Sequence, residues 1–356
     1  MNYSKNYSKN YSNHWKNKAV LITGVCGTVG RELLRQVIDN GPSEVIGLDN
    51  NESELFFLEV EYEGHPNVQF SLGDLRDPAK LIRKMRKVDI VLHAAALKHV
   101  MLCEKSPRDA IQTNIIGVQN VIDAALANGV ERMLFTSSDK AVNPTNVMGT
   151  SKLMGERLMT ATNARQRGST PIFASTRFGN VLGSRGSVIP LFKRQIAMGG
   201  PLTLTDPDMT RFIMTLKDAV RLVMNSVFMA EGGEVFVTKM PVVRIEDLAH
   251  VMREELAPRH GLNPEDIPIE VVGLKPGEKL YDELLNEEET RRAVDLDDYY
   301  VVLPAFKSLY RKLDYTYLNA SPVGIEKPYN SQVETAFSRE ELRNYLIDHH
   351  LLDIEV

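Results

Sequence analysis

Cysteine is scarce in this chain of 356 residues, which contains only Cys26 and Cys103. Two cysteines exclude a disulfide framework and a zinc site built from four cysteines, and they fit the reducing cytoplasm. The eight histidines show no metal-ligand spacing, so no metal site is expected. Long apolar runs are missing too: none approaches the ~18 residues of a membrane-spanning helix, and the polar start has no signal-peptide core. The sequence therefore predicts a cytoplasmic protein with no membrane partner.

An excess of positive charge is also absent. The net charge of −5 argues against a nucleic-acid-binding face spread over the whole surface, so no nucleic-acid partner is expected. Hydrophobic residues make up 43% and charged residues 25%, which excludes wholesale disorder. The length favours one large α/β domain with a smaller lobe.

Three regions follow one another along the chain. Residues 1–16 begin with repeats of Asn-Tyr-Ser-Lys, which predict a disordered low-complexity tail. Residues 17–178 alternate apolar strands with helical patterns, and this alternation predicts a Rossmann-like, doubly wound parallel sheet. Residues 179–356 lose the alternation, and we expect a smaller C-terminal substrate-binding lobe with segments that return to the Rossmann domain. Strands are predicted at 19–22, 44–49, 68–71, 89–93, 132–137 and 171–177, and helices at 31–40, 110–128 and 151–167.

A glycine-rich loop follows the first strand. The stretch from Thr23 to Gly30 reads Thr-Gly-Val-Cys-Gly-Thr-Val-Gly, in which glycines permit a tight turn and close approach of a pyrophosphate to a helix N-terminus. Asp49 ends the second strand about 20 residues on, where a carboxylate accepts from a ribose hydroxyl. No arginine follows Asp49 immediately, which favours NAD over NADP. The cofactor-contacting residues of this loop are predicted to be Thr23, Gly24, Gly27, Thr28, Val29 and Gly30.

Further cofactor contacts are expected after the third and fourth strands. Asp74 and Leu75 follow the third strand, where Asp74 either reaches the adenine amino group or caps the next helix. Small residues after the fourth strand let the backbone approach the cofactor, namely Ala94, Ala95 and Ala96. Asn114 lies on the next helix and is interpreted first as structural, with a main-chain partner.

The residues after the fifth strand carry the chemistry. Ser138-Asp139-Lys140 follows that strand directly, and Met148 and Lys152 lie four residues apart, on one face of the next helix. These segments resemble the extended short-chain dehydrogenase/reductase superfamily, in which a Tyr-x-x-x-Lys pair lies beside the nicotinamide ribose. Lys152 matches the family lysine, whereas Met148 replaces the tyrosine and cannot transfer a proton.

The wider pattern narrows the resemblance. Ser-Asp-Lys-Ala followed by Pro-Thr-Asn-Val-Met-Gly is similar to nucleotide-sugar 4,6-dehydratases of polysaccharide biosynthesis, in particular the branch that acts on UDP-N-acetylglucosamine with retention at C5. Further matching blocks lie at 93–100, 177–190, 203–212 and 273–280. The resemblance implies a hydro-lyase that uses NAD to oxidise C4, eliminates water across C5 and C6, and returns the hydride to C6. It implies that Lys140 is the base, Asp139 the acid and Ser138 the partner of the C4 oxygen, and that Lys152 holds the ribose.

A nucleoside diphosphate needs cations and polar groups in the lobe. Lys98 is expected near both cofactor and substrate, and Glu278 is expected either at the substrate or holding Arg211. The other predicted substrate-contacting residues are His99, Asn180, Arg185, Ser187, Val188, Thr203 and Thr205, and Lys193 is a further candidate cation.

The helix at 110–128 carries an apolar stripe that is most simply core: Ile111, Ile115, Val118, Ile122 and Ala125. The resemblance also implies that this helix takes part in a homodimer interface.

Three alternative functions stay open. The same reaction on GDP-N-acetylglucosamine is one, because the sequence does not reveal the base pocket. A nucleotide-sugar epimerase has no need for Asp139 and Lys140, and Met148 removes its usual base. A non-catalytic NAD(H)-binding sensor has no need for Asp139, Lys140 and Lys152 together.

Overall fold

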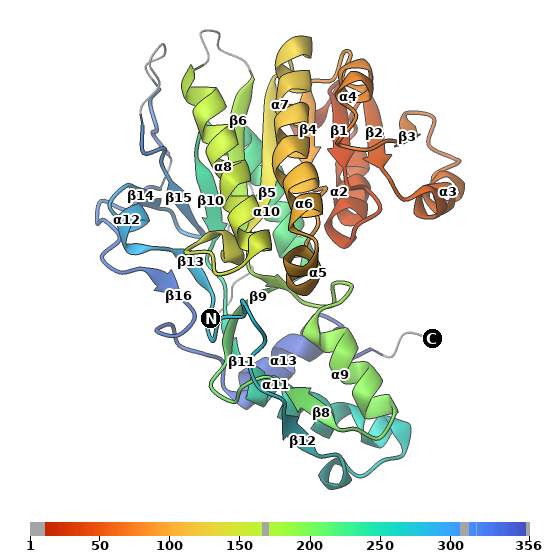
Figure 1. The fold of residues 1–356 in the computed structure, drawn as a ribbon, viewed down its shortest axis with the longest axis vertical. Helices are drawn as coiled ribbons and strands as arrows, with labels where there is room; N and C mark the ends of the chain where they lie inside the picture. Colours follow the sequence, from red (N-terminus) through yellow and green to blue (C-terminus); the bar gives the residue numbers. More distant parts are fainter. Residues whose placement is uncertain (1–10, 166–170, 307–312, 318, 354–356) are drawn as a thin grey trace.

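A computed structural model describes residues 11–165, 171–306, 313–317 and 319–353 (Figure 1). Its centre is a nine-stranded sheet in the order β14-β15-β10-β6-β5-β4-β1-β2-β3. The seven strands from β10 to β3 are parallel to one another, and β15 runs antiparallel to its two neighbours, β10 and β14. The strands are β1 (Ala19–Thr23), β2 (Glu44–Asp49), β3 (Val68–Leu72), β4 (Ile90–His93), β5 (Arg132–Ser138), β6 (Ile172–Phe178), β10 (Val235–Thr238), β14 (Ala293–Asp295) and β15 (Tyr299–Val302). The predicted fold class is confirmed.

Burial on both faces explains why these runs form central strands. Val20, Leu21 and Ile22 in β1 are fully buried, as expected for a parallel strand covered by helices on both sides. The chain order reverses between β1 and β4, which is the point where ligands bind in open α/β sheets.

Helices cover both faces of this sheet (Figure 1). α4, α7 and α8 lie on one face, and α2 and α10 pack together on the other. The helices of this domain are α2 (Thr28–Asp39), α3 (Glu52–Glu61), α4 (Pro78–Lys84), α5 (Val100–Lys105), α6 (Pro107–Ala110), the π-helical turn η1 (Ile111–Ile116), α7 (Gly117–Asn128), the 3-10 turn η2 (Asp139–Ala141), α8 (Val147–Arg165), α10 (Leu216–Met229) and α12 (Glu287–Thr290). No helix among the described residues is long and apolar enough to cross a membrane.

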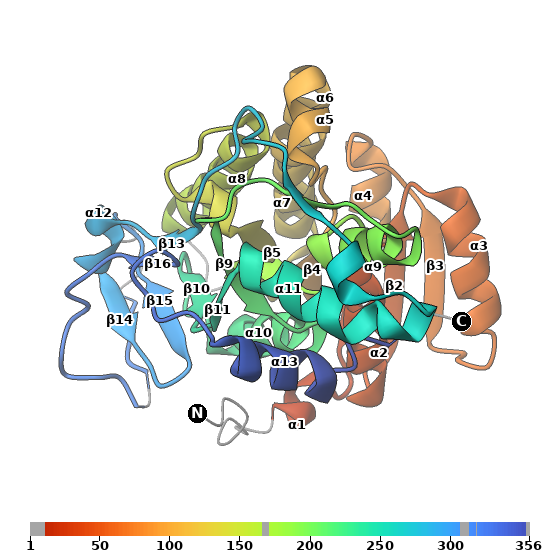
Figure 2. The ribbon, with the colours of Figure 1, turned by 90° about the horizontal axis from the view of Figure 1, so that it is seen from below.

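A smaller lobe lies beyond the carboxyl ends of the parallel strands (Figures 1 and 2). It has its own apolar core, which includes Ile189, Phe192, Leu248 and Leu342. Its helices are α9 (Val188–Ala197), α11 (Ile245–Leu256), α13 (Arg339–Asp348) and the 3-10 turns η3 (Pro258–His260) and η4 (Pro264–Asp266). Its short strands are β7 (Asn180–Val181), β8 (Leu202–Leu204), β9 (Thr210–Met214), β11 (Val242–Arg244) and β12 (Ile269–Val271). Two further short strands, β13 (Glu283–Leu285) and β16 (Tyr329–Asn330), pair with each other and pack on the main core. After residue 178 the chain therefore alternates between the lobe and the large sheet, to which β10, β14 and β15 belong.

The predicted disordered tail is wrong for residues 11–16, while residues 1–10 lie outside the described part of the chain. A short helix, α1 (Ser12–Trp15), packs its Trp15 side chain inside the main core with 1% exposure. The indole meets the Phe228 ring edge-on at 4.8 Å, and Tyr11 stacks on the same ring. The area buried by an indole offsets the entropy of ordering a few polar residues.

The apolar stripe on the predicted helix at 110–128 is only partly core. Val118, Ile122 and Ala125 are buried, but Ile111 is 46% exposed, so the core interpretation is wrong for Ile111. The segment begins as α6, passes through η1 and continues as α7. The first half of the stripe therefore leaves apolar surface uncovered in the single chain.

We predict that Trp15→Ala lowers the free energy of unfolding by about 3 kcal/mol, because the substitution opens a cavity in the core. Urea denaturation followed by circular dichroism measures this, since Trp15 is the sole tryptophan and its fluorescence is lost. Trp15→Phe, which keeps an aromatic ring beside Phe228, is expected to lose less. Equal denaturation midpoints for Trp15→Ala and the native chain would contradict the packing of α1.

Candidate active site

The glycine-rich loop between β1 and α2 is built by close backbone approach. Gly24 has φ +73°, and a Cβ there would lie 2.6 Å from the Ala95 nitrogen. A Cβ on Gly30 would lie 2.0 Å from the Gly24 carbonyl oxygen. The first turn of α2 therefore sits directly on the loop, with its N-terminus at the crevice where a pyrophosphate is accommodated.

Asp49 reaches back to the same loop from the end of β2. Its Oδ2 accepts a hydrogen bond from the Cys26 amide at 2.9 Å, and Oδ1 accepts from the Asn51 amide at 3.0 Å. Thr23 is buried, and its hydroxyl lies 2.6 Å from Nδ1 of His93. These contacts bring the predicted ribose acceptor, the glycine loop and the end of β4 together.

Asp74 and Asn114 have protein partners. Arg76 donates to both carboxylate oxygens of Asp74, and this hydrogen bonding holds the pKa of Asp74 at about 2. Asp77, not Asp74, caps α4 by accepting from the Lys80 amide. Asn114 is buried, bonds both main-chain groups of Leu97 and donates to Ser151, as its structural interpretation predicts. Leu75 is a buried core residue beneath α7.

The predicted acid–base pair, Asp139 and Lys140, follows the end of β5. Asp139 is 4% exposed; Ser138 donates to its Oδ1 at 2.7 Å and Lys140 Nζ donates to its Oδ2 at 2.8 Å. Burial opposes ionisation of Asp139, but the Lys140 charge and these hydrogen bonds outweigh it and lower the pKa of Asp139. Burial likewise opposes the charge on Lys140, yet the carboxylates of Asp139 and Asp282 raise its pKa. The resting pair is therefore a carboxylate and an ammonium ion.

Lys152 lies behind this pair on α8. Its Nζ donates to the Thr136 carbonyl at 2.8 Å and sits 4.8 Å from the centre of the Phe135 ring. Burial lowers the pKa of Lys152 to about 8, partly offset by Glu156. Met148, one turn earlier, is 3% exposed in an apolar cluster with Cys103 and Ala110. The position of the family tyrosine therefore offers no group that ionises.

A cavity of about 440 Å³ opens between the end of β5 and the lobe. Asp139 and Lys140 form part of its wall. Most predicted substrate residues line it as well: His99, Asn180, Ser187, Val188, Thr203, Thr205, Arg211 and Glu278. Segments far apart in the sequence thus meet around the acid–base pair.

Lys98 and Arg185 do not line this cavity. Lys98 Nζ donates to the Arg185 carbonyl at 2.8 Å, and the Arg185 guanidinium lies 3.3 Å from Glu54. The Arg185 amide donates to the Thr28 hydroxyl at 3.4 Å. The loop that contains Arg185 therefore bridges the glycine-rich loop and the lobe.

Glu278 does not hold Arg211. Its carboxylate accepts from the Lys275 amide, whereas Arg211 donates to carbonyl groups and lies 3.6 Å from Asp282. Asp282 is the carboxylate that sequence reasoning missed. It lies two residues beyond the matching block 273–280, where the run Glu-Lys-Leu-Tyr-Asp-Glu (278–283) offered three acids without showing which one is buried.

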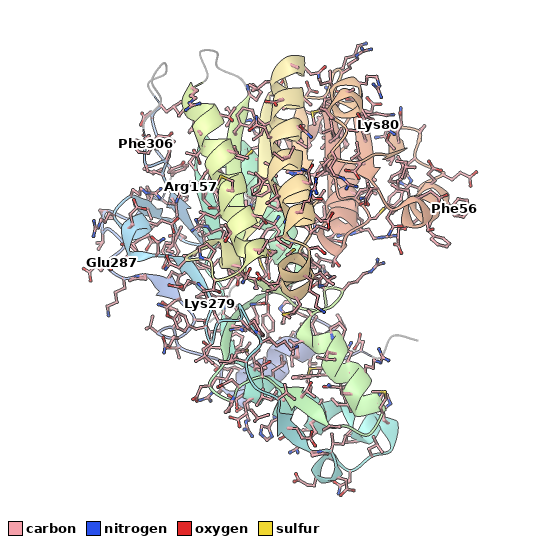
Figure 3. The ribbon with its side chains drawn as sticks, in the orientation of Figure 1. Phe56, Lys80, Arg157, Lys279, Glu287 and Phe306 are labelled. Atoms are coloured by element: carbon pink, nitrogen blue, oxygen red, sulfur yellow. The ribbon has the colours of Figure 1, made fainter. Side chains whose placement is uncertain are left out.

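The further cavity residues that sequence reasoning missed include Asn146, Lys275 and Lys279. Asn146 donates to the Gly277 carbonyl, and Lys279 donates to the Val142 carbonyl and to Glu283. These bonds fix the 275–283 segment against the start of α8. Figure 3 shows Lys279 where the large domain meets the lobe.

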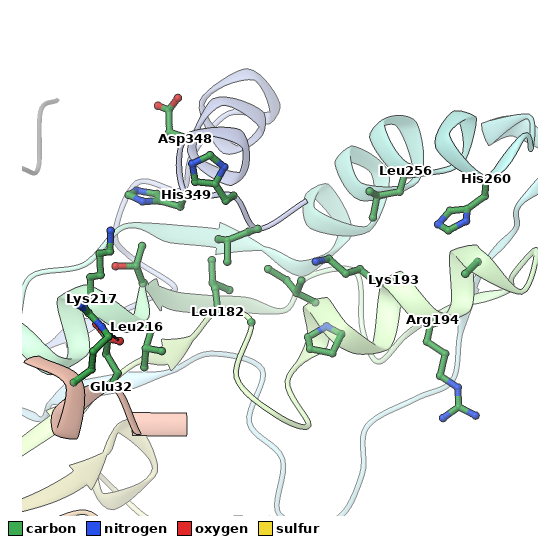
Figure 4. A pocket seen from close by; sticks show the side chains of 18 residues that line it. Glu32, Leu182, Lys193, Arg194, Leu216, Lys217, Leu256, His260, Asp348 and His349 are labelled. Atoms are coloured by element: carbon green, nitrogen blue, oxygen red, sulfur yellow. Dashed lines mark hydrogen bonds and ion pairs between the residues drawn. The ribbon is translucent and has the colours of Figure 1, made fainter. Parts of the chain in front are cut away.

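A larger cavity of about 840 Å³ lies elsewhere, between α2, α9, α10 and the segment after α13 (Figure 4). Lys193 lines it and donates to the Asp353 carbonyl at 2.6 Å, so this candidate cation is not at the acid–base pair. None of the predicted catalytic residues lines this cavity. Size alone therefore does not identify the active site.

Several known proteins are similar to this chain. A protein from Methanocaldococcus jannaschii named as an uncharacterized membrane protein is 47% identical over 86% of this chain and 94% of its own length. A UDP-N-acetylglucosamine 4,6-dehydratase (inverting) of Campylobacter jejuni is 36% identical over 84% of this chain and 86% of its own length. The probable polysaccharide biosynthesis protein EpsC of Bacillus subtilis is 44% identical over 77% of this chain but 46% of its own length.

Solved structures agree with the fold. The X-ray structure of Pen from Bacillus thuringiensis superposes with a TM-score of 0.86 at 41% identity, covering 95% of this chain and 99% of that one. The family model described as "Polysaccharide biosynthesis protein" matches residues 20–304. The chain therefore belongs to the polysaccharide biosynthesis protein family, within the extended short-chain dehydrogenase/reductase superfamily.

Proposed function

We propose that this protein is an NAD-dependent nucleotide-sugar 4,6-dehydratase that acts on UDP-N-acetylglucosamine in the cytoplasm for surface glycan biosynthesis. The observation that carries the proposal is the ion pair between buried Asp139 and partly exposed Lys140, which forms part of the wall of the cavity between β5 and the lobe. Two relatives named for this reaction, both inverting, are 35–36% identical to the chain. For this chain we propose retention at C5.

The cofactor site fits NAD. Gly24 and Gly30 leave room for a pyrophosphate at the start of α2, and Asp49 is placed to accept from the ribose hydroxyls. Lys152 is oriented by Thr136 and is placed to hold the nicotinamide ribose. Bound NAD supplies the hydride acceptor for C4 and, later, the hydride for C6.

The acid and base roles require one proton shift within the pair. In the resting state Lys140 carries the proton and Asp139 does not. A shift across their 2.8 Å hydrogen bond gives a neutral amine and a carboxylic acid. The Lys140 amine then removes the C5 proton, and Asp139 protonates the departing C6 hydroxyl, so both residues return to their resting charges. Ser138 lies beside them to bond the C4 oxygen.

The alternatives are weaker. Relatives named UDP-glucose 4-epimerase are 35% identical to this chain, but Met148 removes the usual base of an epimerase, and epimerisation does not require elimination. A non-catalytic NAD(H)-binding sensor has no need for the Asp139–Lys140 pair. The choice between UDP-linked and GDP-linked N-acetylglucosamine as substrate is decided by experiment.

We predict that the protein converts UDP-N-acetylglucosamine in D2O to a 4-keto product that has a new C6 methyl signal and deuterium at C5. NMR of the reaction measures both, together with the C5 configuration, and a parallel incubation with the GDP-linked sugar tests base preference. Lys140→Ala is expected to lower the rate at least about 100-fold, the usual contribution of a general base.

The matched control is Lys80→Ala, on α4 and remote from the cavity (Figure 3). It is expected to react like the native protein. Vinylic signals without a methyl group would overturn the return of hydride to C6. No reaction of either sugar by protein that carries NAD would favour the sensor.

We predict that Gly30→Ala lowers the amount of NAD that copurifies at least about tenfold, because the new Cβ has no room beside Gly24. Release of the nucleotide by heat and chromatography measures it. Gly64→Ala is the control, since a Cβ there meets nothing within 4 Å and should leave bound NAD unchanged. Equal NAD in both variants would contradict the assigned cofactor site.

We also propose a homodimer through the exposed apolar side chains of α5, η1 and α8. Leu102, Ile111, Ile116 and Met154 are 63%, 46%, 42% and 44% exposed. Met154→Arg is expected to convert the dimer to a monomer in sedimentation velocity, because a charge desolvated at an interface is costly. Val60→Arg, at an exposed apolar position on the distant α3, should leave the dimer intact. A native chain that sediments as a monomer would contradict the proposal.

A further inference from the structure

A second buried carboxyl group stands beside the acid–base pair. Asp282, directly before β13, is 4% exposed and lines the same cavity as Asp139 and Lys140. The carboxyl groups of Asp282 and Asp139 are close enough for each to influence the pKa of the other. Two ionised carboxylates close together repel, so a proton taken up by either one relieves the repulsion.

The surroundings of Asp282 hold it in this place. Its Oδ2 accepts from the Asn180 side chain at 2.6 Å and from the Phe212 amide at 3.1 Å. Its Oδ1 lies 3.6 Å from the Arg211 guanidinium. Arg211 on β9 and Asp139 and Lys140 on η2 are the charged groups that face it. Donors on β7 and β9 and the charge of Lys140 thus support the charged form, and Asp139 opposes it.

These influences bring the pKa of Asp282 close to neutral pH. Burial and then the nearby Asp139 raise the pKa of Asp282 to about 6, against the opposing charges of Arg211 and Lys140. A group that ionises near the working pH both takes up and gives back a proton readily. Asp139, whose pKa is lowered, does not hold a proton by itself.

We propose that Asp282 is a positioning residue that stores, through Asp139, the proton released by the C4 hydroxyl. This inference rests on the proposed dehydratase function. Asp282 would then be the final proton acceptor, a role that Met148, which replaces the family tyrosine, cannot perform.

The proton balance closes over the cycle. During C4 oxidation the O–H bond breaks, and its proton passes through Asp139 to the Asp282 carboxylate. Elimination uses the Asp139–Lys140 pair: Lys140 gains the C5 proton, Asp139 gives a proton to the leaving hydroxyl, and Asp282 keeps its own. When hydride returns to C6, Lys140 gives its proton to C5. The stored proton then moves from Asp282 through Asp139 to Lys140, which restores the starting state.

The test is the pH profile of Asp282→Asn and Asp282→Glu, measured as NADH absorbance in single turnovers and as keto-sugar formed. In the native protein Asp282 must be ionised to accept a proton, so C4 oxidation is expected to fall as the pH drops through about 6. Asp282→Asn is expected to slow C4 oxidation about 100-fold and to lose this acidic limb, with KM little changed. Asp282→Glu is expected to restore the limb and part of the rate.

Asp298→Asn is the matched control. Asp298 is a half-buried carboxyl in the turn between β14 and β15, and burial raises its pKa as well. It should keep the native rate and profile. An Asp282→Asn variant that is folded by circular dichroism and keeps the acidic limb would overturn the storage role while the dehydratase function stands. An Asp282→Glu variant without the limb would also overturn it. A native protein that turns over no nucleotide sugar would overturn both.

Discussion

A buried ion cluster around Arg177 holds the active site together. Arg177, on β6, is 1% exposed and pairs with Glu156 on α8 and Glu289 on α12, each 2% exposed. It also donates to the Leu284 carbonyl on β13. Breaking a buried pair of this kind typically costs about 3–5 kcal/mol, because it leaves a carboxylate without a partner in the interior. The cluster therefore fixes three segments relative to the sheet.

Two of those segments contain or adjoin residues of the proposed chemistry. Glu156 lies one turn after Lys152 on α8, and Leu284 lies two residues after Asp282. The ion cluster thus holds Lys152 and Asp282 in register with the end of β5, which Asp139 and Lys140 follow. Side-chain positions must be held closely for proton transfer, and buried charged hydrogen bonds provide this rigidity.

The charges facing the cavity balance locally. Asp139 and Asp282 are negative, and Lys140 and Arg211 are positive, so the net charge of these four side chains is zero. Because the charges balance, the group can gain or lose one proton at low cost. Met148 lies outside this group, in an apolar cluster. A fold that usually depends on a tyrosine here has a network of two carboxyls and an amine instead.

Local sequence determined the parallel strands, the glycine-rich loop and the Asp139–Lys140 pair, because apolar periodicity and adjacent residues are visible without a fold. It did not determine that Trp15 is buried, since that depends on Phe228, more than two hundred residues away in the chain. Nor did it separate Asp282 from Glu278 and Glu283, because all three are acids in one short loop. Only the tertiary structure decided which carboxyl is desolvated, since burial depends on the lobe's return to the sheet, and desolvation is what changes a carboxyl's proton affinity.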